Sequence, residues 1–149
     1  MDSSDVEIRA GRDVPFEPLL ALYEAVGWLA YTSDQGRQDL QKAVHNATYV
    51  VSAWRGDQLI GLARTLSDDV SVFYLQDLLV HPDFQRQGIG KQLMEKCLER
   101  FRHVRMHVLV TDDEARQHQF YASMGYKNTA NLHKTKLNAF VRLKGVDLE

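Results

Sequence analysis

A short glycine-bearing turn carries the most chemical information in this sequence. Residues 85–90 read QRQGIG, and the apolar residues that follow recur at helical spacing. The start of a helix exposes backbone N–H groups without intrahelical acceptors, and the aligned peptide dipoles place partial positive charge there. Gly88 and Gly90 have no Cβ to keep a ligand away, while Arg86 and Lys91 add full charges suited to phosphate. The turn therefore predicts a site for a pyrophosphate-type ligand. On the glycines alone, a turn that binds nothing is an equal alternative.

The turn does not fit two other phosphate-binding sequences. A dinucleotide-binding fingerprint requires a third glycine and an acidic residue about twenty positions further on, and both are missing. A Walker loop requires a following G-K-S/T, which is also missing.

The order of residues in this turn resembles a known family. Residues 85–90 fit Q/R-x-x-G-x-G/A, the acetyl-coenzyme A signature of the GCN5-related N-acetyltransferases (GNAT), and LLVHP at 78–82 is similar to their preceding strand. A second block, FYASMGY at 120–126, resembles the FY-x-x-x-G-F/Y segment of that family. The resemblance spans roughly residues 7–143. It implies direct acetyl transfer from acetyl-coenzyme A to an amine, without an acyl-enzyme intermediate.

The expected cofactor contacts fall in three places. A pantetheine arm would meet backbone groups at the end of a strand, a pyrophosphate would lie on the turn, and the second block would lie near the thioester. The residues are Leu78, Leu79, Val80, Gln85, Arg86, Gln87, Gly88, Ile89, Gly90, Lys91, Phe120 and Tyr121.

Asp77 is the first candidate for the general base. A free alkylamine has a pKa near 10.4, so its neutral nucleophilic form costs roughly 4–5 kcal/mol at pH 7. Asp77 stands inside an otherwise apolar strand, where desolvation favours a carboxylate that takes up a proton. Many family members have Glu near this position. Two alternatives stay open, namely a water chain without one dedicated base and a carboxylate with a purely structural role.

Tyr121 and Cys97 receive opposite interpretations. Tyr121 matches the family tyrosine that donates a hydrogen bond or proton to the departing sulfur, whereas its sequence context alone favours a core residue. Cys97 lies on the apolar stripe of a helix with no base nearby in sequence, so a buried small residue is favoured over a covalent nucleophile.

Three aromatic residues are candidates for holding the acceptor. Trp28 and Tyr31 lie between two predicted helices, in a region that family members use as a lid over the acceptor, and Tyr74 lies near Asp77 in sequence. Aromatic faces suit an apolar or cationic amine. Asp77 completes the expected acceptor site.

The elements that must position these residues predict an α/β fold with a mixed sheet. The resemblance implies a GNAT-like fold with about seven strands, an antiparallel N-terminal part, a parallel fourth and fifth strand, and about four helices. The strand patterns span residues 6–10, 49–54, 59–66, 70–80 and 104–111, with the last strands at Tyr126 and 140–143. The helix patterns span residues 16–26, 34–46, 89–101 and 113–124.

Length, charge and cysteine usage limit the other possibilities. A chain of 149 residues suits a single domain, residues 1–149. A formal charge of −2 gives no bulk attraction to nucleic acid or to an anionic membrane. A single cysteine excludes an intrachain disulfide, and no run of eighteen apolar residues occurs, so we expect a cytoplasmic protein. The six histidines are scattered, and we expect no metal site.

Three functions remain in competition. The favoured one is an acetyltransferase that acts on a small primary amine. The second uses a protein N-terminus or a lysine side chain as acceptor. The third is a non-catalytic acyl-coenzyme A-binding module, which the presence of both Asp77 and Tyr121 disfavours. Family members often pair, so a homodimer is possible.

Overall fold

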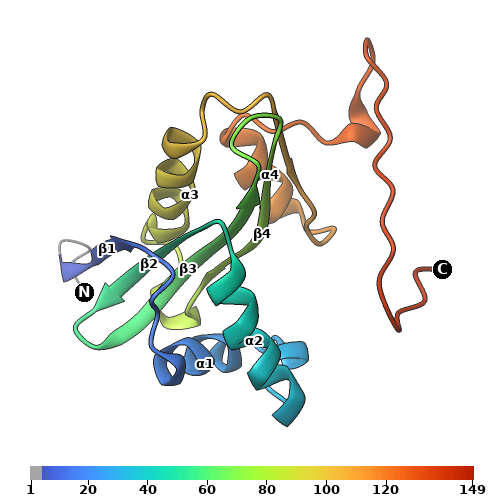
Figure 1. The fold of residues 1–149 in the computed structure, drawn as a ribbon. Coiled ribbons are helices and arrows are strands. Elements are labelled where there is room, and N and C mark those ends of the chain that lie inside the picture. The colour runs from blue at the N-terminus through green and yellow to red at the C-terminus, as the bar shows by residue number, and fades with distance from the viewer. Residues whose placement is uncertain (1–4) are drawn as a thin grey trace. The chain divides into compact units, whose positions relative to one another are not determined.

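The computed structural model describes residues 5–149 and forms two compact units (Figure 1). The first unit is Met1–Val110 and the second is Thr111–Glu149. The single domain expected over residues 1–149 stays a prediction.

The first unit is built on one mixed sheet with the strand order β1-β2-β3-β4-β5. The strands are β1 Glu7–Ala10, β2 Tyr49–Arg55, β3 Gln58–Ser67, β4 Val72–Val80 and β5 Met106–Leu109. The first four strands pair antiparallel, whereas β4 and β5 are parallel. The prediction of an antiparallel N-terminal part and a parallel pair of fourth and fifth strands is confirmed.

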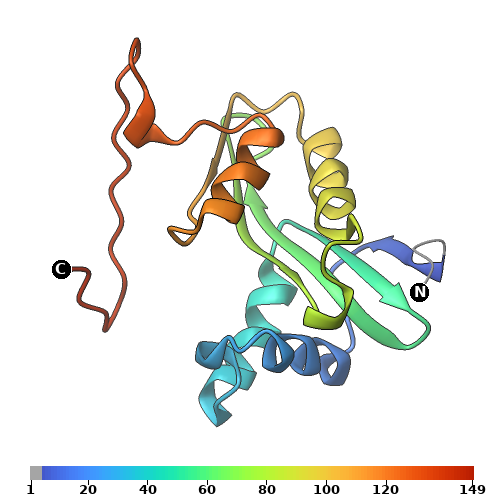
Figure 2. The same ribbon diagram turned by 180° about the vertical axis from the view of Figure 1, so that it is seen from behind.

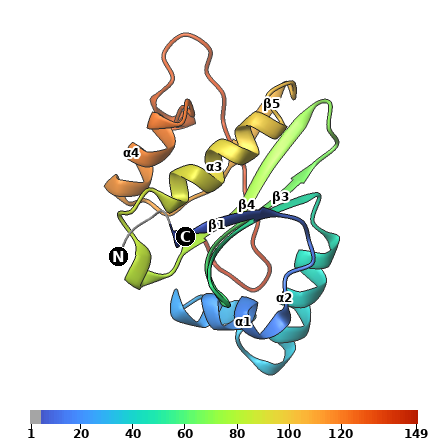
Figure 3. The same ribbon diagram turned by 90° about the vertical axis from the view of Figure 1, so that its left-hand side faces the viewer.

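Helices cover both faces of this sheet (Figures 2 and 3). The helices α1 (Phe16–Ala25) and α2 (Asp34–Asn46) lie on one face, where Leu62 and Leu79 join their apolar side chains in a buried core. The helix α3 (Ile89–Arg100) lies on the other face, where the Phe101 ring that follows it stacks 4.8 Å from that of Phe73. The sheet therefore separates two apolar layers.

The helix boundaries follow from local sequence signals. The Ser33 side chain accepts a hydrogen bond from the Gly36 N–H at 3.1 Å, which caps the start of α2. Gly88 has a left-handed conformation before α3, with φ 79°. Together with α4 (Ala115–Ser123) in the second unit, these helices confirm the expected four. Three short 3-10 turns complete the described elements: η2 Leu29–Tyr31, η3 Pro82–Phe84 and η4 Thr129–Asn131.

A bulge in β4 changes which side chains share a face. Arg64 pairs with Asp77, but the next residue of β3, Thr65, pairs with Leu75, so Gln76 is the extra residue. Side chains normally alternate between faces, which would separate Tyr74 from Asp77. The inserted residue brings them to the same face.

The expected count of about seven strands is wrong in detail, because the described residues form five. Residues 140–143 and Tyr126 were expected to be strands and are not. A strand needs a neighbour for its backbone hydrogen bonds, and residues 140–143 have no ladder partner in the described chain. The Phe140 side chain is 94% exposed, so burial does not hold this segment either.

Within residues 5–149, no helix combines the length and the apolar character that crossing a membrane requires.

Candidate active site

The turn between β4 and α3 has the backbone geometry of an anion site. Arg86 and Gly88 both have positive φ angles, 65° and 79°. No side chain caps the first turn of α3, so its leading N–H groups keep their hydrogen-bonding capacity for a ligand. Left-handed residues in such a turn make a concave array of N–H donors that suits anions. The predicted glycine-lined helix start is therefore present.

Two cations flank the turn. Arg86 is exposed, and the Lys91 ammonium lies 3.8 Å from the Glu95 carboxylate one helical turn further on. Such an exposed pair holds its charges weakly, so Lys91 is free to approach an anionic ligand. The Gln85 side-chain amide donates to the Val80 carbonyl at 3.3 Å and ties the turn to the end of β4.

The edge of β4 is open where it approaches this turn. Among the described residues, β4 pairs with β5 only from Val72 to Leu75. The His81 N–H donates to the Ile60 carbonyl of β3 at 2.8 Å. Backbone groups alternate sides along a strand, so those of Leu78 and Val80 face the opposite edge, which β5 leaves uncovered.

Leu79 differs from its two neighbours. It pairs with Leu62 of β3, and its side chain is buried in the core beneath α1. Its backbone therefore faces β3, and only Leu78 and Val80 present theirs at the open edge.

Asp77 is at the centre of a buried hydrogen-bond network. Its Oδ2 accepts from the Tyr23 hydroxyl at 2.8 Å and from the Arg64 Nε at 2.8 Å. A terminal nitrogen of Arg64 lies 2.7 Å from the same oxygen, and the two side chains are only 7% and 6% exposed. The same guanidinium donates to the Tyr31 hydroxyl at 3.2 Å. The carboxylate therefore has a buried cationic partner, and four elements of the first unit meet here.

The predicted acceptor residues lie around this network. The Tyr23 ring makes edge contacts with Trp28 at 5.7 Å and with Tyr31 at 5.5 Å. The bulge brings Tyr74 to the face of Asp77, and burial and the negative charge of Asp77 both raise the pKa of Tyr74. The structure thus brings together all four expected acceptor residues.

Tyr23 and Arg64 were not among the predicted site residues. Tyr23 has the spacing of an ordinary core residue in a helix. Arg64 offered a signal, because it is a charged residue inside the apolar run of a predicted strand, as Asp77 is. Two opposite charges buried in adjacent strands are expected to pair.

The second unit contains Phe120 and Tyr121 in α4. Their rings make an edge contact at 5.1 Å, and Tyr121 makes another with Tyr126 at 6.1 Å. Burial raises the pKa of Tyr121 to about 12, so the phenol keeps its proton near neutral pH.

Cys97 is fully buried in α3, and burial raises the pKa of its thiol to about 12. A nucleophilic cysteine needs an accessible thiolate, so the interpretation as a packing residue is supported. Among residues 5–149 there is no group of three or more side chains arranged to hold a metal ion.

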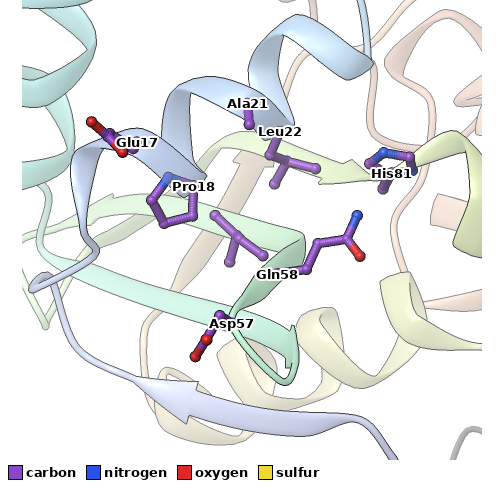
Figure 4. A pocket seen from close by; sticks show the side chains of 8 residues that line it. Glu17, Pro18, Ala21, Leu22, Asp57, Gln58 and His81 are labelled. Carbon is purple, nitrogen blue, oxygen red and sulfur yellow. The ribbon is translucent and has the colours of Figure 1, made fainter.

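A groove of about 370 Å³ lies elsewhere in the first unit (Figure 4). Pro18 and Leu22 of α1 line it together with the hairpin residue Gln58 and with His81. The sticks show that its walls come from α1, the β2–β3 hairpin and the end of β4. None of the predicted site residues lines it.

Comparison with known proteins identifies the family. Residues 20–144 match the family model described as the acetyltransferase (GNAT) domain. The chain belongs to the GNAT acetyltransferases. It is therefore an acyltransferase, and the family implies acetyl-coenzyme A as cosubstrate.

A curated relative and two solved structures illustrate the similarity. An uncharacterized N-acetyltransferase, ycf52, of Pyropia yezoensis is 23% identical to this chain. The match covers 85% of this chain and 72% of the length of that protein. The structure of a GNAT family acetyltransferase from Streptococcus pneumoniae has a TM-score of 0.75 and 32% identity, covering 93% of this chain and 99% of that one. The second structure is an aminoglycoside acetyltransferase from an uncultured soil metagenomic sample, in complex with sisomicin. It has a TM-score of 0.68 and 23% identity, covering 95% of this chain and 98% of that one. These structures support the GNAT-like fold.

Proposed function

We propose that this protein is an acetyl-coenzyme A-dependent N-acetyltransferase that transfers the acetyl group directly to a primary amine of a small molecule. The observation that carries the proposal is the open edge of β4. It leads from the glycine turn to Asp77, so a cofactor bound at the turn and an acceptor bound near Asp77 would meet along one strand.

The residues of the turn and of β4 fit acetyl-coenzyme A. The backbone groups of Leu78 and the N–H of Val80 would hold the pantetheine amides, because an amide chain can pair with a free strand edge. The Val80 carbonyl already accepts from the Gln85 side chain. The N–H groups of residues 87–91 would hold the pyrophosphate, with Arg86 and Lys91 beside them. When bound, acetyl-coenzyme A supplies the thioester that the amine attacks.

The proton of the amine would leave by way of Asp77. Three donor atoms already contact Oδ2, so this oxygen has little capacity to receive a proton. The proton would therefore reach Oδ1, directly or through water. Asp77 also fixes the surrounding side chains through Tyr23 and Arg64.

Tyr121 would donate a hydrogen bond to the departing thiolate. Its raised pKa of about 12 keeps the phenol protonated, as a donor requires. A thiol with a pKa near 8.5 leaves without full protonation, so a hydrogen bond is sufficient help. Phe120 would pack beside the cofactor, as its position in the family motif suggests.

Trp28, Tyr31 and Tyr74 would hold the apolar body of the acceptor. The Arg64 charge compensates that of Asp77, which favours an amine recognised through aromatic contacts. The structural neighbour that has an aminoglycoside bound supports a small-molecule acceptor at the level of the fold.

The same proposal includes a homodimer and a cytoplasmic location. Phe140 and Val146 of the second unit are strongly exposed, and apolar side chains of this kind favour a protein partner. A second copy of this chain is the simplest partner, and sedimentation of the purified protein tests it. The free thiol of Cys97 suits a reducing compartment.

The decisive experiment is a thiol-release assay with acetyl-coenzyme A and a panel of acceptors. The panel contains arylalkylamines, polyamines, an aminoglycoside and a lysine-containing peptide. We expect turnover with at least one small amine and none with the peptide. Turnover with the peptide alone would show that the acceptor is a protein amine and not a small molecule. Calorimetric heat of acetyl-coenzyme A binding, without turnover of any acceptor, would favour a binding module.

A further inference from the structure

The 3-10 turn η2 is in unusually close contact with the first turn of α2. Gly36 is buried there, and a Cβ built on it would lie 2.3 Å from the Ala30 carbonyl oxygen and 2.9 Å from the Ser33 Oγ. Carbon atoms do not approach this closely, so any larger residue would push η2 away from α2. The absent side chain of Gly36 therefore sets how near η2 can lie.

Arg64 also holds η2, through contacts with Tyr31. Its guanidinium donates to Asp77 on β4 and, with a terminal nitrogen, to the Tyr31 hydroxyl at the end of η2. The same group lies 5.8 Å from the centre of the Tyr31 ring. A planar guanidinium can donate in several fixed directions at once, whereas an ammonium is a point charge. Arg64 thus connects η2 to the strand that carries Asp77.

Tyr23 connects the same segment to Asp77. Its hydroxyl donates to Asp77, and its ring contacts those of Trp28 and Tyr31 at the two ends of the same short segment. The segment between α1 and α2 is therefore held by side-chain and backbone contacts before any substrate arrives.

We infer that Arg64 and Gly36 are positioning residues that fix η2 as a preformed wall of the acceptor site. Arg64 acts through Tyr31 and Asp77, and Gly36 acts by its missing side chain. The functional part of this inference rests on the proposed amine acetyltransferase activity. Neither residue contacts the reacting atoms, and their effect is on the acceptor rather than on the cofactor.

Tyr31→Phe and Arg64→Lys test the connection through a double-mutant cycle. Tyr31→Phe removes the hydroxyl and keeps the ring. Arg64→Lys keeps the charge and loses the planar guanidinium that donates in several directions. A hydrogen bond from a charged donor makes a contribution that corresponds to roughly tenfold. We expect each variant to raise the KM for the amine about tenfold, with the KM for acetyl-coenzyme A within twofold. The KM for the amine in the double variant should be little higher than in either single variant.

Tyr49→Phe is the matched control. Tyr49 lies on the other face of the sheet, where its ring contacts Phe101 at 5.6 Å. This variant also removes one tyrosine hydroxyl from the first unit, and we expect both KM values within twofold of the wild type. Additive effects in the cycle, or an equal rise in the KM for acetyl-coenzyme A, would overturn the inference.

Amide hydrogen exchange gives a readout that needs no turnover. If Arg64 and Tyr31 hold the segment, exchange at residues 29–36 should become about tenfold faster in Tyr31→Phe and Arg64→Lys, without substrate and below the onset of global unfolding. Unchanged exchange there would refute the positioning role. If no amine is acetylated but exchange accelerates as expected, the proposed function fails and the positioning of η2 stands.

Gly36→Ala tests the contact between η2 and α2. Replacing a helical glycine by alanine ordinarily stabilises a protein, but here the Cβ meets the Ala30 carbonyl. We expect a lower Tm and faster exchange at residues 29–31, whereas Gln38→Ala, at an exposed position of the same helix, should change neither. A Tm raised by Gly36→Ala would show that η2 is not held against α2.

Discussion

The glycine turn before α3 and the network around Asp77 are connected by β4, but they are built in different ways. The turn consists mainly of backbone, with two left-handed residues and uncapped N–H groups at an exposed helix start. The network consists of buried side chains from α1, β3 and β4 and of the half-buried Tyr31 from η2. A site made of backbone depends on neighbouring residues, whereas a site made of side chains depends on the pairing of distant elements.

This difference predicts how each region responds to change. A substitution in the turn should alter the affinity for the cofactor and leave the rest of the fold intact. A substitution in the network should affect stability and the acceptor, because an unpaired charge would remain buried in the core.

The largest expected effect comes from Arg64→Met, which leaves Asp77 without its cationic partner. Breaking a buried ion pair typically removes about 3–5 kcal/mol from the free energy of unfolding. Urea denaturation followed by circular dichroism measures this loss. The double variant Arg64→Met/Asp77→Leu removes both charges and should recover at least half of it. Equal instability of the single and double variants would contradict a paired charge.

The next effect is expected from Tyr121→Phe, with kcat lowered by roughly one to three decades, because the departing thiolate loses its hydrogen-bond or proton donor. The affinity for acetyl-coenzyme A should stay the same in calorimetry. Because burial raises the pKa of Tyr121 to about 12, its phenol stays protonated as the pH rises from 8 to about 11. The kcat of the wild type should therefore show no fall caused by this group in that range. An unchanged kcat in a folded Tyr121→Phe variant would exclude the residue from the mechanism.

A smaller effect is expected from Gly88→Ala. Alanine at a left-handed position costs about 1–2 kcal/mol, so the turn should shift and its N–H groups should lose their alignment. We expect the Kd for acetyl-coenzyme A to rise roughly tenfold in calorimetry.

Gly56→Ala is the control for this prediction, because Gly56 also has a positive φ, 59°, and open space where a Cβ would lie. It stands in the hairpin between β2 and β3, so it should lose stability without losing cofactor affinity. Equal losses of affinity in both variants would show that the turn has no special role.

The smallest effect is expected from Lys91→Gln. The side chain is exposed, so its attraction to a phosphate is screened by salt. Affinity for acetyl-coenzyme A should fall a few-fold at low ionic strength and hardly at all at 1 M salt. Glu95→Gln removes the partner of Lys91 and should not weaken binding. A loss that does not depend on salt would contradict an electrostatic role.

Much of the fold could be predicted from the sequence, because its elements have strong local signals. The hairpin, the helix that follows the glycine turn and the parallel fifth strand are all where the patterns indicate. The strands expected near Tyr126 and at residues 140–143 are the main error. Their β-rich composition says nothing about whether a neighbouring strand is present to pair with them.

The sequence by itself determined the glycine turn with its predicted anion site, the family motifs and the candidate roles of Asp77 and Tyr121. Only the tertiary structure joined Arg64 to Asp77 thirteen residues away and to Tyr23 on another element, and only the bulge at Gln76 brought Tyr74 to their face. The physical reason is that the conformation of a turn is decided by adjacent residues. The partners of a buried charge are decided instead by strand register, which a single extra residue reverses.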